Sequence, residues 1–161
     1  MARRGKSLFR EHPYRNEVLS HIHRFRSTNE KGLFALAKDI ARLTADSIDI
    51  TALQEIAAPP KGERWGSLKS LEKVLATVCT SEDARRALAP LVGTYQLRLA
   101  DAHLPGCELA EAMKLVGIDG SSLALHQGQT LIANCANAAM VIASMLERLA
   151  SREIDKGDMD D

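Results

Sequence analysis

The sequence has few aromatic residues and no paired cysteines. Aromatic side chains make up 4% of the 161 residues, so a core must be built mainly from Leu, Ala, Ile and Val, the residues typical of helix packing. The three cysteines, Cys79, Cys107 and Cys135, are odd in number and far apart, which argues against a disulfide framework or a zinc site. We therefore expect buried, reduced thiols.

The chain also lacks an uninterrupted hydrophobic run. Polar residues break its most apolar stretch, 123–149, at His126, Gln127, Gln129, Asn134 and Asn137. The first residues, MARRGKSLFREH, lack the apolar segment of a signal peptide. These two absences predict a cytoplasmic protein with no membrane association.

Neither sign of charge is in excess, because 21 Lys and Arg balance 21 Asp and Glu, but the charges are unevenly placed. Residues 1–31 hold eight Lys or Arg against three Glu, whereas the tail is acidic. A basic segment of this density either binds nucleic-acid phosphates or serves solubility alone. For the first alternative, the expected RNA-binding residues are Arg10, Arg15, Arg24 and Arg26.

Apolar residues recur at spacings of three and four along most of the chain, which predicts amphipathic helices. Capping-box patterns at STNE (27–30) and TSED (80–83) mark two helix starts, and Pro90 is expected to kink or restart the helix that contains it. The other helices are expected over Tyr14–Phe25, 67–78, 108–116 and 128–150. The spacing places Phe25 on the inner face of the first helix, and Leu33, Leu36 and Ile40 on that of the helix after STNE. The last helix is expected to pack inward through Leu131, Ile132, Ala138, Val141, Ile142, Met145 and Leu149. No period-two run predicts a strand, so the expected fold is an all-α helical bundle of five to six helices.

A loop rich in proline and glycine, AAPPKGERWG, is the best internal boundary. It separates a basic helical segment, residues 1–58, from a helical bundle, residues 67–150. We expect the two to pack together as a single domain, followed by a disordered acidic tail over 151–161.

The stretch RLADAH places Arg98 and His103 around Asp101 at the end of a predicted helix. Residues five apart lie about 140° apart around a helix axis, so Arg98 and His103 do not share a face. The ordinary interpretation is a surface ion pair of Arg98 with Asp101, and a favourable charge of His103 near the helix C-terminus.

RLADAH also resembles the motif of the HEPN superfamily, an arginine followed by four to six residues and a histidine, and its ending is similar to that of the abortive-infection branch. The resemblance extends at most over residues 67–150. It implies metal-independent RNA cleavage, in which His103 is the general acid or base, Arg98 stabilises the phosphate, and Asp101 orients His103 or pairs with Arg98. Nuclease members usually have a polar residue directly after the arginine, and here that residue is Leu99.

In that superfamily two protomers form one cleft, so the resemblance implies a homodimer, with an antitoxin as a further protein partner. It implies no cofactor and no metal. Small residues on the last predicted helix, which allow helices to approach closely, agree with self-association: Ala133, Ala136, Ala139 and Ala143.

A second match to the same motif is RNEVLSH, in which Arg15 and His21 are separated by five residues and Asn16 supplies the polar neighbour. Three functions therefore stay open: a ribonuclease of defence or toxin type, a catalytically silent helical module that binds RNA or protein, and a structural dimerisation domain. Leu99 favours the second over the first, and the basic N-terminal segment favours the first two over the third.

Overall fold

A computed structural model describes residues 9–11, 13–99 and 106–157, with side chains as far as Ser151. These residues form seven α-helices and two 3₁₀ helices, and within them the only β-type pairing is an isolated bridge between Phe9 and Ile48. The all-α prediction is confirmed. The elements in chain order are α1 (Arg15–His21), η1 (Arg24–Arg26), α2 (Glu30–Leu43), η2 (Ala45–Ser47), α3 (Ile50–Ile56), α4 (Ser67–Leu75), α5 (Ser81–Leu97), α6 (Gly106–Val116) and α7 (Ala124–Gly157).

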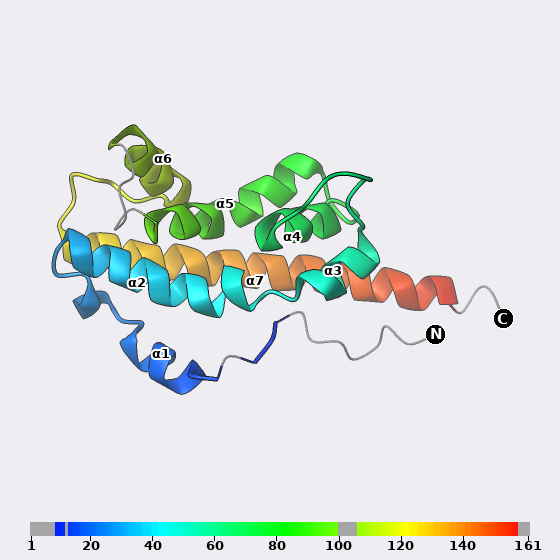
Figure 1. The fold of residues 1–161 in the computed structure, drawn as a ribbon, viewed down its shortest axis with the longest axis horizontal. Helices are drawn as coiled ribbons and strands as arrows, with labels where there is room; N and C mark the ends of the chain where they lie inside the picture. The colour runs from blue at the N-terminus through cyan, green and yellow to red at the C-terminus, as the bar shows by residue number, and fades with distance from the viewer. Residues whose placement is uncertain (1–8, 12, 100–105, 158–161) are drawn as a thin grey trace.

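The helices are arranged around α7, which runs the length of the molecule (Figure 1). Helix α2 lies alongside it, and α4, α5 and α6 cover one side of this pair. Helix α1 lies on the opposite, outer side of α2. Helix α2 therefore separates α1 from the α5–α6 side of the bundle.

One hydrophobic core joins the segments on both sides of the loop over 57–66. Leucines that are 0% exposed come from α2, α3, α4, α5 and α7, and they belong to one cluster. Burial of this kind contributes about 25 cal/mol per Å² of apolar surface, so each of these side chains stabilises the fold substantially. These leucines are Leu33, Leu36, Leu53, Leu71, Leu75, Leu97 and Leu131.

The predicted inner face of α7 is confirmed in most positions. Leu131, Ala138 and Ile142 are buried, while Ile132, Met145 and Leu149 pack against the core at its edge. Val141 was also expected to face inward, but it is 46% exposed. The helix therefore turns an apolar side chain toward solvent.

The two predicted capping boxes have different outcomes. Thr80 caps α5 as expected, with its Oγ1 accepting from the Asp83 N–H at 3.0 Å. In STNE the cap is Asn29, whose Oδ1 accepts from the Gly32 N–H at 2.9 Å. Ser27 is instead fully buried and donates to the Ala124 carbonyl at 2.7 Å, so it holds η1 against the start of α7.

Several helix boundaries differ from the prediction. The helix expected over Tyr14–Phe25 stops at His21, because Ile22 leaves helical geometry (φ −85°, ψ 83°) and a short 3₁₀ helix follows. Pro90 does not restart its helix, since α5 continues through it to Leu97. Helix α7 extends to Gly157, into the tail expected to be disordered.

By length and composition, residues Ala124–Ser151 of α7 would suffice to cross a membrane. Only 22% of the most apolar window lies buried in the structure, so the stretch presents an exposed face. Core helices of soluble proteins reach the same length and hydropathy, so this feature of α7 assigns no compartment.

Candidate functional site

Arg98, the first of the three predicted catalytic residues, is held by two neighbours. It caps the C-terminal end of α5, where its Nη1 donates to Oδ2 of Asp46, and its guanidinium lies 4.2 Å from the centre of the Tyr95 ring. The Arg98 side chain is 22% exposed. The two other predicted catalytic residues, Asp101 and His103, lie outside the described residues.

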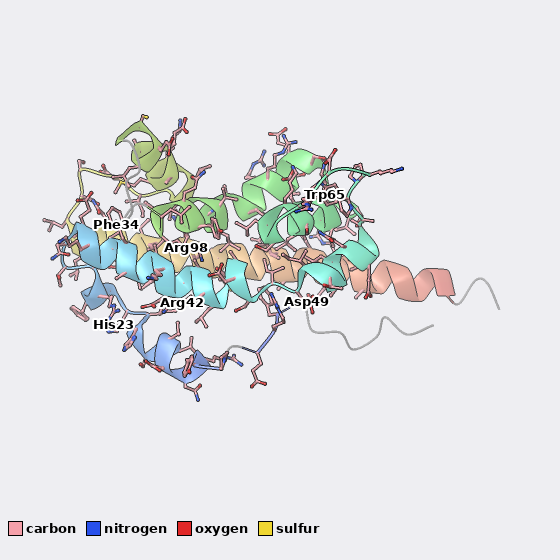
Figure 2. All side chains as sticks on the ribbon, in the orientation of Figure 1. His23, Phe34, Arg42, Asp49, Trp65 and Arg98 are labelled. Atoms are coloured by element: carbon pink, nitrogen blue, oxygen red, sulfur yellow. The ribbon has the colours of Figure 1, made fainter. Side chains whose placement is uncertain are left out.

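The partner of Arg98 gives this arginine a structural task. Asp46 belongs to η2, which directly follows α2, so the ion pair ties the end of α5 to the end of α2; Figure 2 labels Arg98 at the side of α5 that faces α2. Stacking on Tyr95 adds a cation–π contact. An arginine engaged in this way is less available to a phosphate, which favours the catalytically silent alternative.

The four predicted RNA-binding arginines do not converge on one point. Arg10 donates to the Ile48 carbonyl at 3.2 Å, and Arg26 forms an ion pair with Asp39 at 3.5 Å. Arg15 is exposed on α1, and Arg24 is exposed in η1. The last two therefore present their guanidinium groups to solvent on the N-terminal side of the molecule.

Arg24 belongs to an exposed cluster that we call the basic aromatic turn, residues His23–Arg26. Its centre is Phe25, which is 61% exposed. The Arg24 guanidinium carbon lies 4.9 Å from the centre of the Phe25 ring, and the His23 ring centre lies 6.4 Å from it with the planes tilted by 48°. A large aromatic ring is thus displayed to solvent between positive or titratable groups; Figure 2 labels His23 at this turn, between α1 and α2.

Buried contacts with α7 hold the basic aromatic turn in place. Ser27, directly after it, is fully buried and bonded to the first residue of α7. Gly128 of α7 is also buried, and a Cβ at this position would collide with Ser27, so the two segments need a glycine to approach this closely. The exposure of Phe25 therefore comes from a fixed backbone.

Phe25 was missed at the sequence level because the helical spacing assigned it to the inner face of a helix. A signal was present: aromatic and basic residues alternate in HRFR, a pattern that is unusual for a core position. Tyr14, at the start of the same predicted helix, was given no role from the sequence, and it is 64% exposed.

The rival motif RNEVLSH is not brought together. Arg15 lines a hollow of about 500 Å³ with Phe9, Leu19 and Leu43, whereas His21 lines a different one. The two residues of the motif therefore face separate surfaces of α1.

The second hollow lies between α1 and α2, has a volume of about 360 Å³ and is named here the α1–α2 pocket. Asp39, at its α2 wall, is only 5% exposed. Its Oδ1 lies 3.5 Å from Nη1 of Arg42, and its Oδ2 lies 3.5 Å from Nη2 of Arg26. The lining residues are Tyr14, Glu17, Val18, His21, Asp39 and Arg42.

The three cysteines differ in how deeply they are buried. Cys135 is buried as expected, and burial raises the pKa of its thiol, which lies 3.0 Å from Oγ1 of Thr94. Cys79 is half-buried, while Cys107 is exposed, contrary to expectation.

No group of three His, Cys, Asp or Glu side chains that could hold a metal occurs among the residues the structure describes.

Comparisons with protein-family models, with curated proteins and with solved structures found no match. The fold defines the class of this protein as an all-α helical bundle. The resemblance of RLADAH to the HEPN motif stays a prediction.

Proposed function

We propose that this protein is a cytoplasmic RNA-binding helical protein that holds single-stranded RNA on its basic N-terminal side. The observation that carries the proposal is the basic aromatic turn, in which a 61% exposed Phe25 lies beside the Arg24 guanidinium. Aromatic rings that stack bases, next to cations that attract the backbone, are the usual means of binding single strands. Exposed Arg15 on α1 adds positive charge on the same side.

A single strand suits this surface better than a duplex. Bases within a duplex are already stacked on each other and are not available to Phe25, whereas an unpaired base exposes both faces. The arginines Arg15 and Arg24 supply phosphate contacts that carry no sequence information. Binding is therefore expected to depend on strandedness and on salt.

Cleavage of the bound RNA is not part of the proposal. Arg98, the phosphate-binding member of the HEPN-like motif, is paired with Asp46 and stacked on Tyr95. It also lies between α5 and α2, on the other side of α2 from α1 (Figure 2). These observations favour a binding module over a metal-independent ribonuclease of defence or toxin type.

The first test is the binding of the full chain to a fluorescent single-stranded RNA over a range of salt concentrations. We expect affinity to fall linearly in a plot of log K against log salt, with a slope of about −0.7 for each phosphate contact on a single strand. A duplex of the same sequence should bind more weakly, because it offers no unstacked base. Equal affinity for the two forms, or binding that salt does not change, would contradict the proposal.

The same samples separate binding from cleavage. Incubation of the RNA with excess protein and a chelator should leave it intact. Should cleavage occur and disappear in both Arg98→Ala and His103→Ala, the ribonuclease interpretation would replace the one proposed here. Loss of cleavage in Arg15→Ala and His21→Ala alone would instead assign it to the rival motif.

We also propose that the protein forms a homodimer through α7. Between residues 124 and 146 the sequence has no Asp, Glu, Lys or Arg, so two copies of this surface meet without charge repulsion. Exposed small or flexible side chains recur there at spacings of three and four, which suits close packing of two helices. They are Ala133, Ala136, Met140 and Ala143.

Sedimentation at micromolar concentration is expected to give the mass of a dimer. Ala136→Glu should raise the dissociation constant of the dimer at least tenfold, because it places a carboxylate in an apolar contact. Ala110→Glu, at an exposed position of α6, is the matched control and should leave the mass unchanged. A monomeric wild-type protein would refute the dimer.

A further inference from the structure

The α1–α2 pocket combines groups of both charge signs with two rings. Arg42 is opposed by the carboxylates of Glu17 and Asp39, while Tyr14 and His21 supply flat faces. Arg26 approaches Asp39 from outside the lining. The positive and negative groups nearly balance, so the pocket does not favour a free phosphate, and it fits a neutral ligand with both donors and acceptors.

The buried carboxylate of Asp39 points to a ligand that donates. Asp39 is 5% exposed, and its Oδ2 has no hydrogen-bond partner. Both arginines approach it at 3.5 Å, which is longer than the 2.7–2.9 Å typical of charge-assisted hydrogen bonds. The acceptor capacity of this carboxylate is therefore not filled, and buried polar groups of proteins are rarely left so.

We propose that the α1–α2 pocket binds a guanine base of an RNA chain. Guanine presents two neighbouring acceptors, O6 and N7, which arginine recognises, and two neighbouring donors, N1–H and N2–H, which suit a carboxylate. Arg42 meets the acceptor edge, and Asp39, with Glu17, meets the donor edge. The Tyr14 ring, 64% exposed at the mouth, stacks on the base.

The size of the pocket agrees with this ligand. Its volume of about 360 Å³ lies at the small end of the range for small-molecule sites, about 300–1,000 Å³, and suits one base with its ribose. Adenine has a donor where guanine has O6, and it lacks both donors that face a carboxylate. It would therefore place a donor against Arg42 and leave Asp39 without a partner.

The inference rests on the proposed RNA binding for the source of the base, but free nucleotides test it separately. The full chain is titrated with GMP, AMP and IMP, the last of which keeps O6, N7 and N1–H but lacks the N2 amino group. We expect GMP to bind at least tenfold more tightly than AMP, with IMP between them. Equal affinities for GMP and AMP, or no binding of GMP, would overturn the assignment.

Two substitutions in the α1–α2 pocket test whether the preference for GMP over AMP depends on it. Arg42→Gln and Tyr14→Ala change side chains that are 45% and 64% exposed, so both proteins should fold, and each should lose the preference for GMP. Arg85→Gln, an arginine that is 68% exposed and paired with Glu72, is the matched control and should keep it. A preference for GMP that survives both pocket variants would show that guanine binds elsewhere.

The Phe25→Ala protein distinguishes the two proposals. It should bind RNA more weakly and still prefer GMP, because Phe25 does not line the pocket. RNA binding without a preference for GMP would refute the guanine site alone. A preference for GMP without RNA binding would refute the proposed function alone.

Discussion

Phe25→Ala is expected to weaken the binding of single-stranded RNA roughly 5- to 150-fold, because stacking of a base on an aromatic side chain contributes about 1–3 kcal/mol. The ring is 61% exposed, and no residue of η1 is buried, so its removal takes away little packing. The free energy of unfolding should change by less than about 0.5 kcal/mol, as for ordinary surface substitutions. Fluorescence anisotropy of a labelled RNA and urea unfolding measure the two effects.

Two further proteins make this result interpretable. Phe25→Trp should keep most of the affinity, because a larger ring still stacks on a base. Ile56→Ala changes a residue that is 36% exposed in α3, at the other end of the molecule from η1 (Figure 1), and it should bind RNA as the wild type does. If Phe25→Ala binds normally, or loses stability in step with affinity, Phe25 is not a stacking platform.

The fold class follows from the sequence because local rules act on neighbouring residues. The spacing of Leu33, Leu36 and Ile40 predicts that they form the inner face of α2, and all three are buried. Thr80 signalled the start of α5 through a cap that spans three residues. The end of α1 at His21 could not be read in the same way, since η1 turns where Ser27 meets α7, about a hundred positions away in the chain.

The site was less accessible to sequence reasoning, because its contacts join distant segments. The ion-pair partner of Arg98 in the structure is Asp46, which lies 52 positions away, whereas the sequence suggested neighbouring Asp101. No pattern in the sequence marks Asp39, which is buried between Arg26 and Arg42. Arg42 lies three positions further along α2, but Arg26 reaches Asp39 only because η1 packs against α2.

Gly93 allows α5 and α6 to pack closely, which helix propensity alone does not predict. It lies in the middle of α5, where glycine is less favourable than alanine by about 0.5–1 kcal/mol. A Cβ there would lie 2.6 Å from the Ala112 carbonyl oxygen, 2.7 Å from Cγ2 of Val116 and 2.9 Å from Cβ of Leu115. All three atoms belong to α6, so this glycine lets α6 lie directly on α5.

Gly93→Ala is therefore expected to destabilise the protein by about 1–3 kcal/mol, as overpacking of a well-packed site does, although the same change in an open helix would stabilise it. The backbone oxygen of Ala112 cannot rotate away, so α6 must shift as a whole. Gly106→Ala, at the first position of α6 with no atom within 4 Å of a new Cβ, is the matched control and should stay within about 0.5 kcal/mol of the wild type. Urea unfolding followed by circular dichroism compares the three proteins, and an equal or higher stability of Gly93→Ala would mean that α6 does not pack on α5 at this distance.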